Sequence, residues 1–242
     1  MKRCLSCFLL CALAIPANAS DTESWQWAVT PYVWLPQTSV DLSLQDTGLG
    51  GGTVGFKDLL DQLDVGFMIG VEGVRNHWGF FSDLTYVEIS DSEQRPVFLV
   101  RTETEATMLD FGLSYWPGGA GSDLALLAGV RYNGFDNRFT FRLGDTVVAD
   151  VRDDDAYYDA LVGLRYRYDF AGPWELLTRV DASFGDSEGT WMARATFGRT
   201  VGQSGRNRLL LGYQYQRADF QMGDLETSFT YHGPTAGFSF RF

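Results

Sequence analysis

The last residues of the chain alternate strictly between apolar and small or polar side chains. Phe238, Phe240 and Phe242 are two positions apart, and Ser239 and Arg241 lie between them. Residues two apart in an extended strand point to the same face, so the three rings share one face. Such a row favours aggregation at a soluble sheet edge, whereas in a transmembrane barrel it forms part of the lipid-facing aromatic girdle.

The same alternation recurs along the chain in segments that are separated by turn residues. In one segment Val65, Phe67 and Ile69 fall on one face, and Gly66 and Met68 fall on the other. Segments of this kind predict an all-β chain of about ten antiparallel strands, with roughly eight to twelve as the range. We expect the strands at residues 25–44, 65–75, 78–89, 98–116, 124–141, 157–170, 174–184, 191–200, 208–220 and 229–242.

Short connections between these strands alternate with longer, mostly acidic ones. The short turns are near residues 76, 118, 172 and 205, and the longer connections span 46–64, 91–97, 143–155 and 221–227. This order is typical of an up-and-down transmembrane β-barrel with short periplasmic turns and long outer loops. A soluble β-sandwich is the alternative, but it would have to bury large side chains from both faces while polar positions alternate on every strand.

The first long connection contains a pattern of a different period. Phe56, Leu59, Leu60 and Leu63 are spaced as one apolar face of a helix. The sequence therefore predicts a short helix within residues 56–64, which packs on the barrel rim or dips into the lumen.

The beginning of the chain predicts a secretory signal peptide. A positively charged start precedes an apolar run at residues 4–15 and a small-residue cleavage motif at 16–19. We expect cleavage of residues 1–19 and a barrel domain over 20–242. The apolar run is too short to span a bilayer. All 3 cysteines lie in the segment that is removed, so we expect no disulfide and no thiolate metal site in the mature protein.

Composition narrows the class further. The chain has 18 Phe, 11 Tyr, 7 Trp and 27 Gly, and no mature segment approaches the ~18 unbroken apolar residues of a membrane helix. A helical membrane protein is therefore excluded. The formal net charge of −12 disfavours nucleic acid as a partner, because phosphate binding relies on clustered lysine and arginine.

Together the signal peptide, the opening strand at 27–36, the segment 56–64 and the Phe-Ser-Phe-Arg-Phe ending resemble small Gram-negative outer-membrane β-barrel proteins. The resemblance implies an outer-membrane location, with membrane lipid and lipopolysaccharide as neighbours. It also implies that Phe238, Phe240 and Phe242 form the signal read by the barrel-assembly machinery. It implies no activity, because such barrels include pores, enzymes, adhesins and structural proteins.

Charged residues of both signs occupy the face opposite the large apolar side chains. Charges in a narrow lumen are costly unless they are paired, so we expect an ion-pair network that fills the interior. A narrow ion-selective pathway lined by the same residues is the alternative. The predicted inward residues are Glu72, Asp83, Asp110, Arg131, Asp159, Arg165, Arg167, Glu175, Arg179, Asp181, Arg194 and Gln214.

Candidate catalytic and metal-binding groups are sparse. His77 is expected at a periplasmic turn and His232 in the outer part of the last strand, where it would be the centre of any rim hydrolase site. No nucleophile, base and orienting group accompany it. The acidic segment 145–155 holds Asp145, Asp150, Asp153, Asp154 and Asp155, but it lacks the glycine and glutamate of a calcium loop.

We therefore expect a solvated acidic loop, no metal and no cofactor. The sequence predicts a non-enzymatic outer-membrane barrel with a largely filled lumen and an envelope-structural or surface-interaction role. A narrow channel for ions or small solutes and a hydrolase with a site near His232 are the alternatives.

Overall fold

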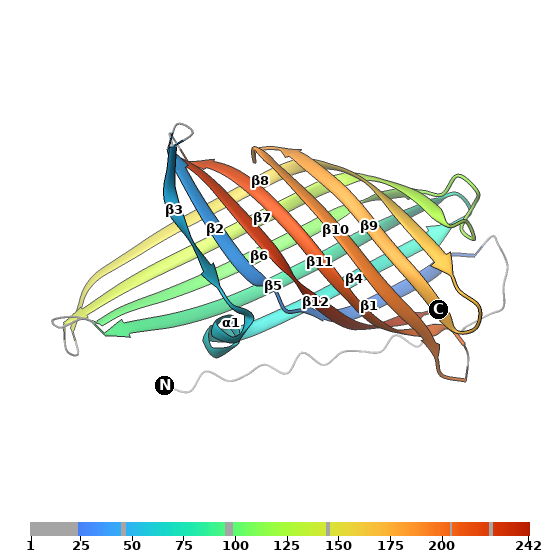
Figure 1. Cartoon of the computed structure of the whole chain (residues 1–242), viewed down its shortest axis with the longest axis horizontal. Coiled ribbons are helices and arrows are strands. Elements are labelled where there is room, and N and C mark those ends of the chain that lie inside the picture. The colour runs from blue at the N-terminus through green and yellow to red at the C-terminus, as the bar shows by residue number, and fades with distance from the viewer. Residues whose placement is uncertain (1–23, 45–46, 95–98, 144–145, 204, 223–224) are drawn as a thin grey trace.

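A computed structural model describes residues 24–44, 47–94, 99–143, 146–203, 205–222 and 225–242. The predicted signal peptide lies outside these residues. The elements, in chain order, are β1 Gln26–Trp34, β2 Gln37–Leu44, β3 Thr47–Val54, α1 Phe56–Gln62, β4 Leu63–Arg75, β5 Trp78–Gln94, β6 Leu99–Tyr115, β7 Leu124–Leu143, β8 Thr146–Asp169, β9 Trp174–Gly185, β10 Gly189–Val201, β11 Asn207–Met222 and β12 Leu225–Arg241 (Figure 1).

The strands close into an antiparallel barrel. Within the described residues, ten strands, β1 and β4 to β12, follow one another around the wall. β1 pairs with β12 to close the ring, with Ala28 opposite Arg241 and Trp34 opposite Thr235. The predicted ten-stranded up-and-down barrel is thus confirmed.

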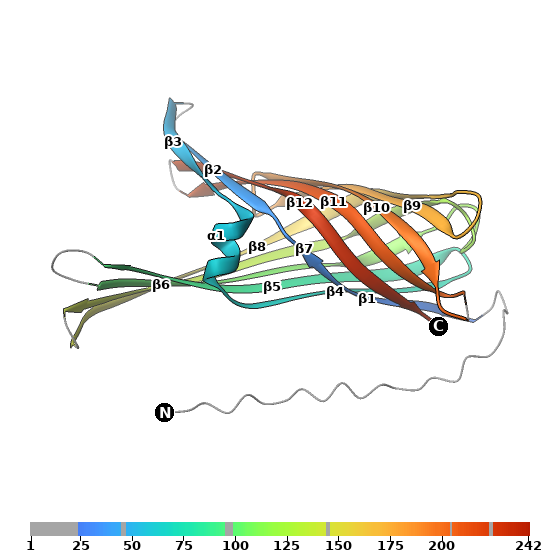
Figure 2. The same cartoon turned by 60° about the horizontal axis from the view of Figure 1, so that its bottom comes forward.

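A hairpin of β2 and β3 is added outside this ring. β2 continues beyond β1 along the outer part of β12, and β3 pairs with β2 at the edge of the sheet. The glycine-rich stretch 48–52 was expected in a loop, and this expectation is wrong. The segment pairs with β2, and the hydroxyls of Ser39 and Thr53 lie 3.1 Å apart across the two strands. The predicted helix is present as α1, which lies between β3 and β4 and contacts β5 (Figure 2).

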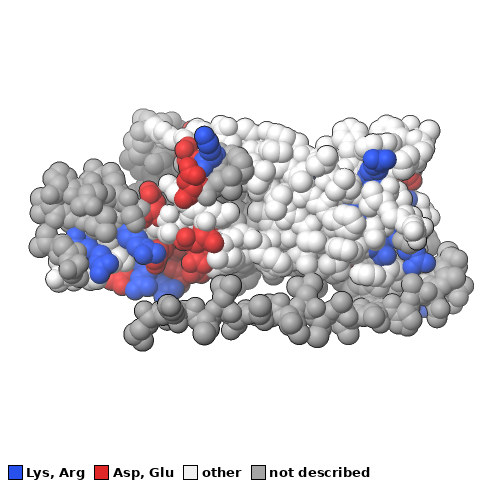
Figure 3. All heavy atoms as spheres, turned by 90° about the horizontal axis from the view of Figure 1, so that it is seen from below, with Lys and Arg blue, Asp and Glu red and all other residues white. Residues whose placement is uncertain are grey.

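Apolar side chains cover the outside of the barrel. On β8, Val162 and Leu164 point outward and are half exposed, while Leu161, next to Val162, is buried inside. On the face shown in Figure 3, an uncharged band separates two charged ends. An outward apolar band of this kind matches the hydrocarbon layer of a membrane. Among the described residues, no helix is long and apolar enough to cross a membrane.

One end of the barrel, here called the terminal end, carries the start of β1 and the end of β12 (Figure 1). The backbones of Trp27 and Phe242 exchange two hydrogen bonds there, with N to O distances of 3.3 and 3.0 Å. Short connections between strands lie at the same end, at residues 76–77, 116–123, 170–173 and 202–206.

At the opposite end, four strands continue beyond the closed ring (Figures 1 and 2). β4 stops pairing with β5 at Ile89, and β9 stops pairing with β8 at Asp159. Beyond these positions β5 to β8 pair only with one another, as far as the described residues show. We call this four-stranded projection the extension.

The extension corrects the prediction of an acidic loop over residues 145–155. Asp145 lies outside the described residues, but the other four aspartates lie in β8 and pair with β7. Two crossed ion pairs join this part of β8 to β7. Arg138 donates to Asp150 at 2.9 and 2.5 Å, and Arg152 donates to Asp136 at 3.1 and 2.5 Å.

These hydrogen bonds also affect titration. The bonds from Arg152 hold the pKa of Asp136 below its usual range, and the bonds from Arg138 do the same for Asp150.

Candidate functional site

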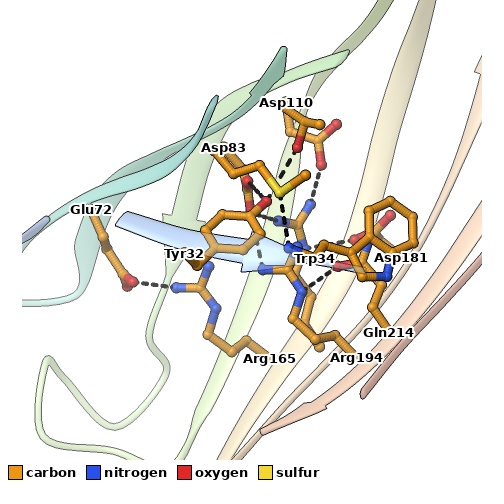
Figure 4. Close-up of polar contacts among 12 residues, drawn as sticks. Tyr32, Trp34, Glu72, Asp83, Asp110, Arg165, Asp181, Arg194 and Gln214 are labelled. Carbon is orange, nitrogen blue, oxygen red and sulfur yellow. Dashed lines mark hydrogen bonds and ion pairs between the residues drawn. The ribbon is translucent and has the colours of Figure 1, made fainter. Parts of the chain in front are cut away.

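A layer of six charged side chains crosses the middle of the lumen (Figure 4). Arg131 donates to both oxygens of Asp110, at 2.7 and 2.8 Å, and to Asp181 at 2.8 Å. Arg179 donates to Asp181 and to Asp110, at 2.6 Å each. The two remaining members pair across the lumen, as described below. We call this set the central layer, and its members are Asp83, Asp110, Arg131, Arg179, Asp181 and Arg194.

The barrel wall places like charges side by side within this layer. Asp83 is opposite Asp110 in the β5–β6 ladder, and Arg179 is opposite Arg194 in the β9–β10 ladder. Like charges at opposed positions destabilise a sheet. Partners across the lumen compensate them, because Asp83 accepts from Arg194 at 3.1 Å and Asp110 accepts from Arg179.

These contacts join opposite walls of the barrel. In the ring of ten described strands, β5 and β10 are five positions apart, so the bond between Asp83 and Arg194 spans the full width of the lumen. Three carboxylates and three guanidiniums make the layer formally neutral. The layer therefore satisfies its own charges, and its ion pairs cross the lumen at this level.

Two neutral side chains complete the central layer. The hydroxyl of Tyr32 on β1 donates to Asp83 at 2.6 Å, and Gln214 on β11 accepts from Arg194 at 2.6 Å. The guanidinium of Arg194 also lies over the ring of Tyr32, 5.1 Å from its centroid. Aromatic and amide partners of this kind hold a guanidinium in one orientation.

Asp159 is buried beside the layer, but among the residues that the structure describes it pairs with no arginine. The β7–β8 register places it opposite Arg131, which instead reaches Asp110 and Asp181. Its oxygens accept hydrogen bonds from the hydroxyls of Ser183 and Ser187 and from the backbone N–H of Ser187. Asp159 thereby fixes the connection between β9 and β10.

Aromatic rings narrow the lumen between the central layer and the extension. Phe220 on β11 contacts Tyr157 and Phe229, at centroid distances of 4.6 and 5.8 Å. Tyr231 on β12 continues the row toward Trp34 on β1, with centroids 6.2 Å apart. These rings form a contiguous aromatic group in the outer half of the lumen.

On the terminal side of the central layer, the lumen widens into a cavity of about 750 Å³, here called the vestibule. Arg165 and Glu72 form an ion pair at 2.6 Å within it. Glu175 is paired with two arginines, Arg208 at 2.7 Å and Arg241 at 3.4 Å.

The structure places the predicted inward residues at three levels of the lumen. Six form the central layer, with Gln214 bound to it, and Asp159 lies beside it. Glu72, Arg165, Arg167 and Glu175 lie in or next to the vestibule. Sequence reasoning did not single out Tyr32 or Arg208, and it placed Arg241 on the inner face without a partner. The two-residue alternation also places Arg208 on the inner face. Only the three-dimensional structure shows that Arg208 and Arg241 share the carboxylate of Glu175.

Among the described residues, neither histidine has the nucleophile and orienting group of a catalytic site beside it. His77 lies in the turn between β4 and β5, against the ring of Tyr115 at 6.3 Å. The Nδ1 of His232 lies 2.7 Å from the hydroxyl of Tyr213, and its ring stacks near Tyr215. His232 shares the outer face of the barrel with these tyrosines, so the geometry gives the hydrolase alternative no support.

The C-terminal phenylalanines lie on the outer face at the seam between β12 and β1. Phe240 and Phe242 are nearly half exposed, and the rings of Phe238 and Phe240 are 4.8 Å apart. Among the described residues, no group of three or more histidine, cysteine or acidic side chains is arranged to hold a metal ion.

Solved structures of bacterial outer-membrane proteins match this chain. The outer-membrane protease OmpT from Escherichia coli matches with a TM-score of 0.52 and 11% identity, over 93% of this chain and 99% of that chain. The fold is that of an outer-membrane β-barrel. The attachment invasion locus protein Ail of Yersinia pestis, in complex with the heparin analogue sucrose octasulfate, matches with a TM-score of 0.41 and 10% identity, over 90% and 99% of the two chains.

The translocator domain of the autotransporter NalP from Neisseria meningitidis gives a TM-score of 0.40 and 9% identity, over 90% of this chain and 89% of that chain. No family model and no curated protein sequence matches the chain. A shared fold does not transfer an activity, so function has to be argued from the lumen and the extension.

Proposed function

We propose that this protein is a closed, non-conducting barrel of the outer membrane that holds the extension outside the cell as an interaction surface. In this orientation the terminal end faces the periplasm and the extension faces outward, as the short turns favour. The central layer carries the proposal, because its ion pairs link opposite walls of the lumen.

Closure follows from the energetics of the layer. The side chain of Asp181 is 0% exposed, and those of Arg131 and Arg179 are 3% and 6% exposed. An ion that entered would have to break these pairs and leave a charge buried without its partner, which costs about 3–5 kcal/mol. The narrow-channel alternative therefore requires a rearrangement that the lumen geometry opposes.

The composition of the extension supports its proposed role as an interaction surface. Its outer face carries the crossed ion pairs of β7 and β8, and these hold two strands together in water. Val147, Val148 and Val151 are about half exposed near the tip, well away from the apolar band of the barrel. Exposed apolar groups on a solvated arm mark surfaces that meet a partner.

Solute flux into liposomes tests closure. Liposomes that contain the wild-type barrel should swell in small sugars at the rate of empty liposomes. The double variant Asp83→Ala/Arg194→Ala removes one acid and one base together and should increase the rate. Swelling by the wild type at the rate of an open porin would refute a closed lumen. Normal heat-dependent gel mobility of the variant provides the control for folding.

Shortening the extension tests the interaction role. A variant in which a tight turn replaces residues 137–151 should insert normally but lose cell–cell aggregation in a complemented deletion strain. The exchange variant Arg138→Asp/Asp150→Arg keeps the ion pair and should retain aggregation. If the shortened variant aggregates as the wild type does, the extension is not the interaction surface. Uptake of a hydrophobic dye by the same strains measures separately whether the protein has an envelope-structural role.

We further propose that Phe240 and Phe242 act with Phe238 as the assembly signal. All three lie on the accessible outer face of the seam strand, where a partner can reach them before the barrel closes.

A further inference from the structure

The vestibule is a chamber with an unusual charge composition. It is blocked on one side by the central layer, and residues of the terminal rim, among them Trp25, Arg206 and Phe242, line its other side. Outside the neutral central layer, its described lining residues include five arginines and one acidic residue, Glu72. The chain as a whole has a net charge of −12. A basic chamber in an acidic protein focuses a positive potential at this end of the lumen.

The arginines of the vestibule have fewer carboxylate partners than they need. Arg165 pairs with Glu72, while Arg208 and Arg241 share the single carboxylate of Glu175. Three guanidiniums therefore face two carboxylates. An excess charge inside a narrow lumen is costly unless a counter-charge balances it.

Arg167 adds to this excess. Its ion pairs, with Asp169 at 3.6 Å and Asp123 at 3.9 Å, are long, and both carboxylates are more than half exposed at the rim. Exposed pairs of this length contribute little. The Nε atoms of Arg167 and Arg241 are buried and have no hydrogen-bond partner among the described residues. The positive charges of Arg167 and Arg208 also repel that of Arg241.

The remaining lining suits the body of a small organic molecule. Trp27, Phe81 and Trp116 line the vestibule together with the arginines. A volume of about 750 Å³ lies within the usual range of ligand pockets, which combine apolar walls with a few placed polar groups. Planar guanidiniums bind phosphate and carboxylate oxygens with paired N–H donors.

We propose that the vestibule binds small organic anions that carry a phosphate or carboxylate group, with Arg167 and Arg241 as the principal donors. The bound anion balances the excess guanidinium charge, and its body rests on the aromatic wall. Because the central layer blocks the lumen above it, the vestibule binds from the periplasmic side and does not pass the ligand through. The inference rests on the proposed orientation but not on the role of the extension.

Calorimetry with the refolded barrel in a phosphate-free detergent tests this site. Phenyl phosphate is the probe, and phenol and inorganic phosphate separate the contributions of body and charge. We expect phenyl phosphate to bind with one site per barrel, inorganic phosphate to bind more weakly and phenol not to bind. Arg167→Gln and Arg241→Gln should each weaken phenyl phosphate binding by at least about tenfold, as loss of a charge-assisted hydrogen bond predicts.

Arg199→Gln is the matched control. Arg199 lies on the outer face, with its guanidinium 5.5 Å from the ring centroid of Trp174, so the same change of charge occurs outside the vestibule. It should leave binding unchanged. Absence of phenyl phosphate binding by the folded wild type would overturn the proposal, and so would an equal loss in Arg199→Gln and Arg241→Gln.

The phosphate group could come from a soluble molecule or from a phospholipid headgroup. Repeating the titration in nanodiscs with and without phosphatidylglycerol distinguishes the two sources. Unchanged affinity assigns the site to a soluble anion, and competition assigns it to a headgroup with the same chemistry. Either result is independent of the liposome-swelling experiment, so failure of this site and failure of the closed lumen are separately visible.

Discussion

Neutralising Asp181 is the sharpest test of the energetics of the central layer. Its side chain is 0% exposed, and its two oxygens accept from Arg131 at 2.8 Å and from Arg179 at 2.6 Å. Asp181→Asn leaves Arg131 with Asp110 alone and Arg179 with Asp110 and the more distant Asp83, at 3.7 Å. Removing one partner of a buried ion pair costs about 3–5 kcal/mol. With a urea slope of about 3 kcal/mol per M, the unfolding midpoint should fall by about 1–2 M.

Urea titration of the folded barrel, followed by tryptophan fluorescence and by heat-dependent gel mobility, measures this shift. Asp154→Asn makes the same chemical change at an exposed position of the extension and should leave the midpoint unchanged. The double variant Asp181→Asn/Arg131→Gln restores neutrality, so its cost should be well below the sum of the single costs. A midpoint for Asp181→Asn that equals that of Asp154→Asn would show that the layer is solvated and would refute the reasoning.

Three further predictions concern other parts of the chain. The pKa values of Asp136 and Asp150 are lowered in the folded state, so their ion pairs should persist above about pH 4 and be lost as the pH falls through the lowered values. Amide hydrogen exchange in the extension measures this loss, and a loss of protection between pH 8 and 6 would contradict the prediction. Phe242→Ala keeps the backbone hydrogen bonds of the seam, so the variant should refold normally in detergent. In cells, a gel-shift assay should show a several-fold decrease in the amount of assembled barrel, and full assembly would exclude the proposed signal. A Cβ at Gly112 would lie 2.7 Å from the Cα of Gly129, so Gly112→Ala should cost about 1–3 kcal/mol in the urea titration, and wild-type stability would show that β6 and β7 can separate there.

The barrel itself could be predicted from the sequence because its main determinant is local. Alternation with a period of two fixes which side chains face lipid, and it needs no knowledge of which strands pair. The same alternation placed Asp83, Asp110 and Arg179 on the inner face, where the structure has them. The turn near Asn76 and the helix at 56–62 were also readable from local pattern.

Features that depend on pairing between distant residues could not be predicted in this way. In the acidic run of β8, Asp150 pairs with Arg138 on β7, and Arg152 of the same run pairs with Asp136 on β7. Arg131 lies opposite Asp159 in the ladder, yet it binds carboxylates on β6 and β9. Side-chain reach across a lumen is set by barrel diameter and stagger, which one sequence does not reveal.

Single-channel recording in a planar lipid bilayer tests the closed lumen most directly. After gel mobility confirms a folded barrel, the wild-type protein should insert without discrete current steps, and the variant Asp83→Ala/Arg194→Ala should produce them. Regular, salt-dependent steps from the wild type would contradict a lumen closed by the central layer.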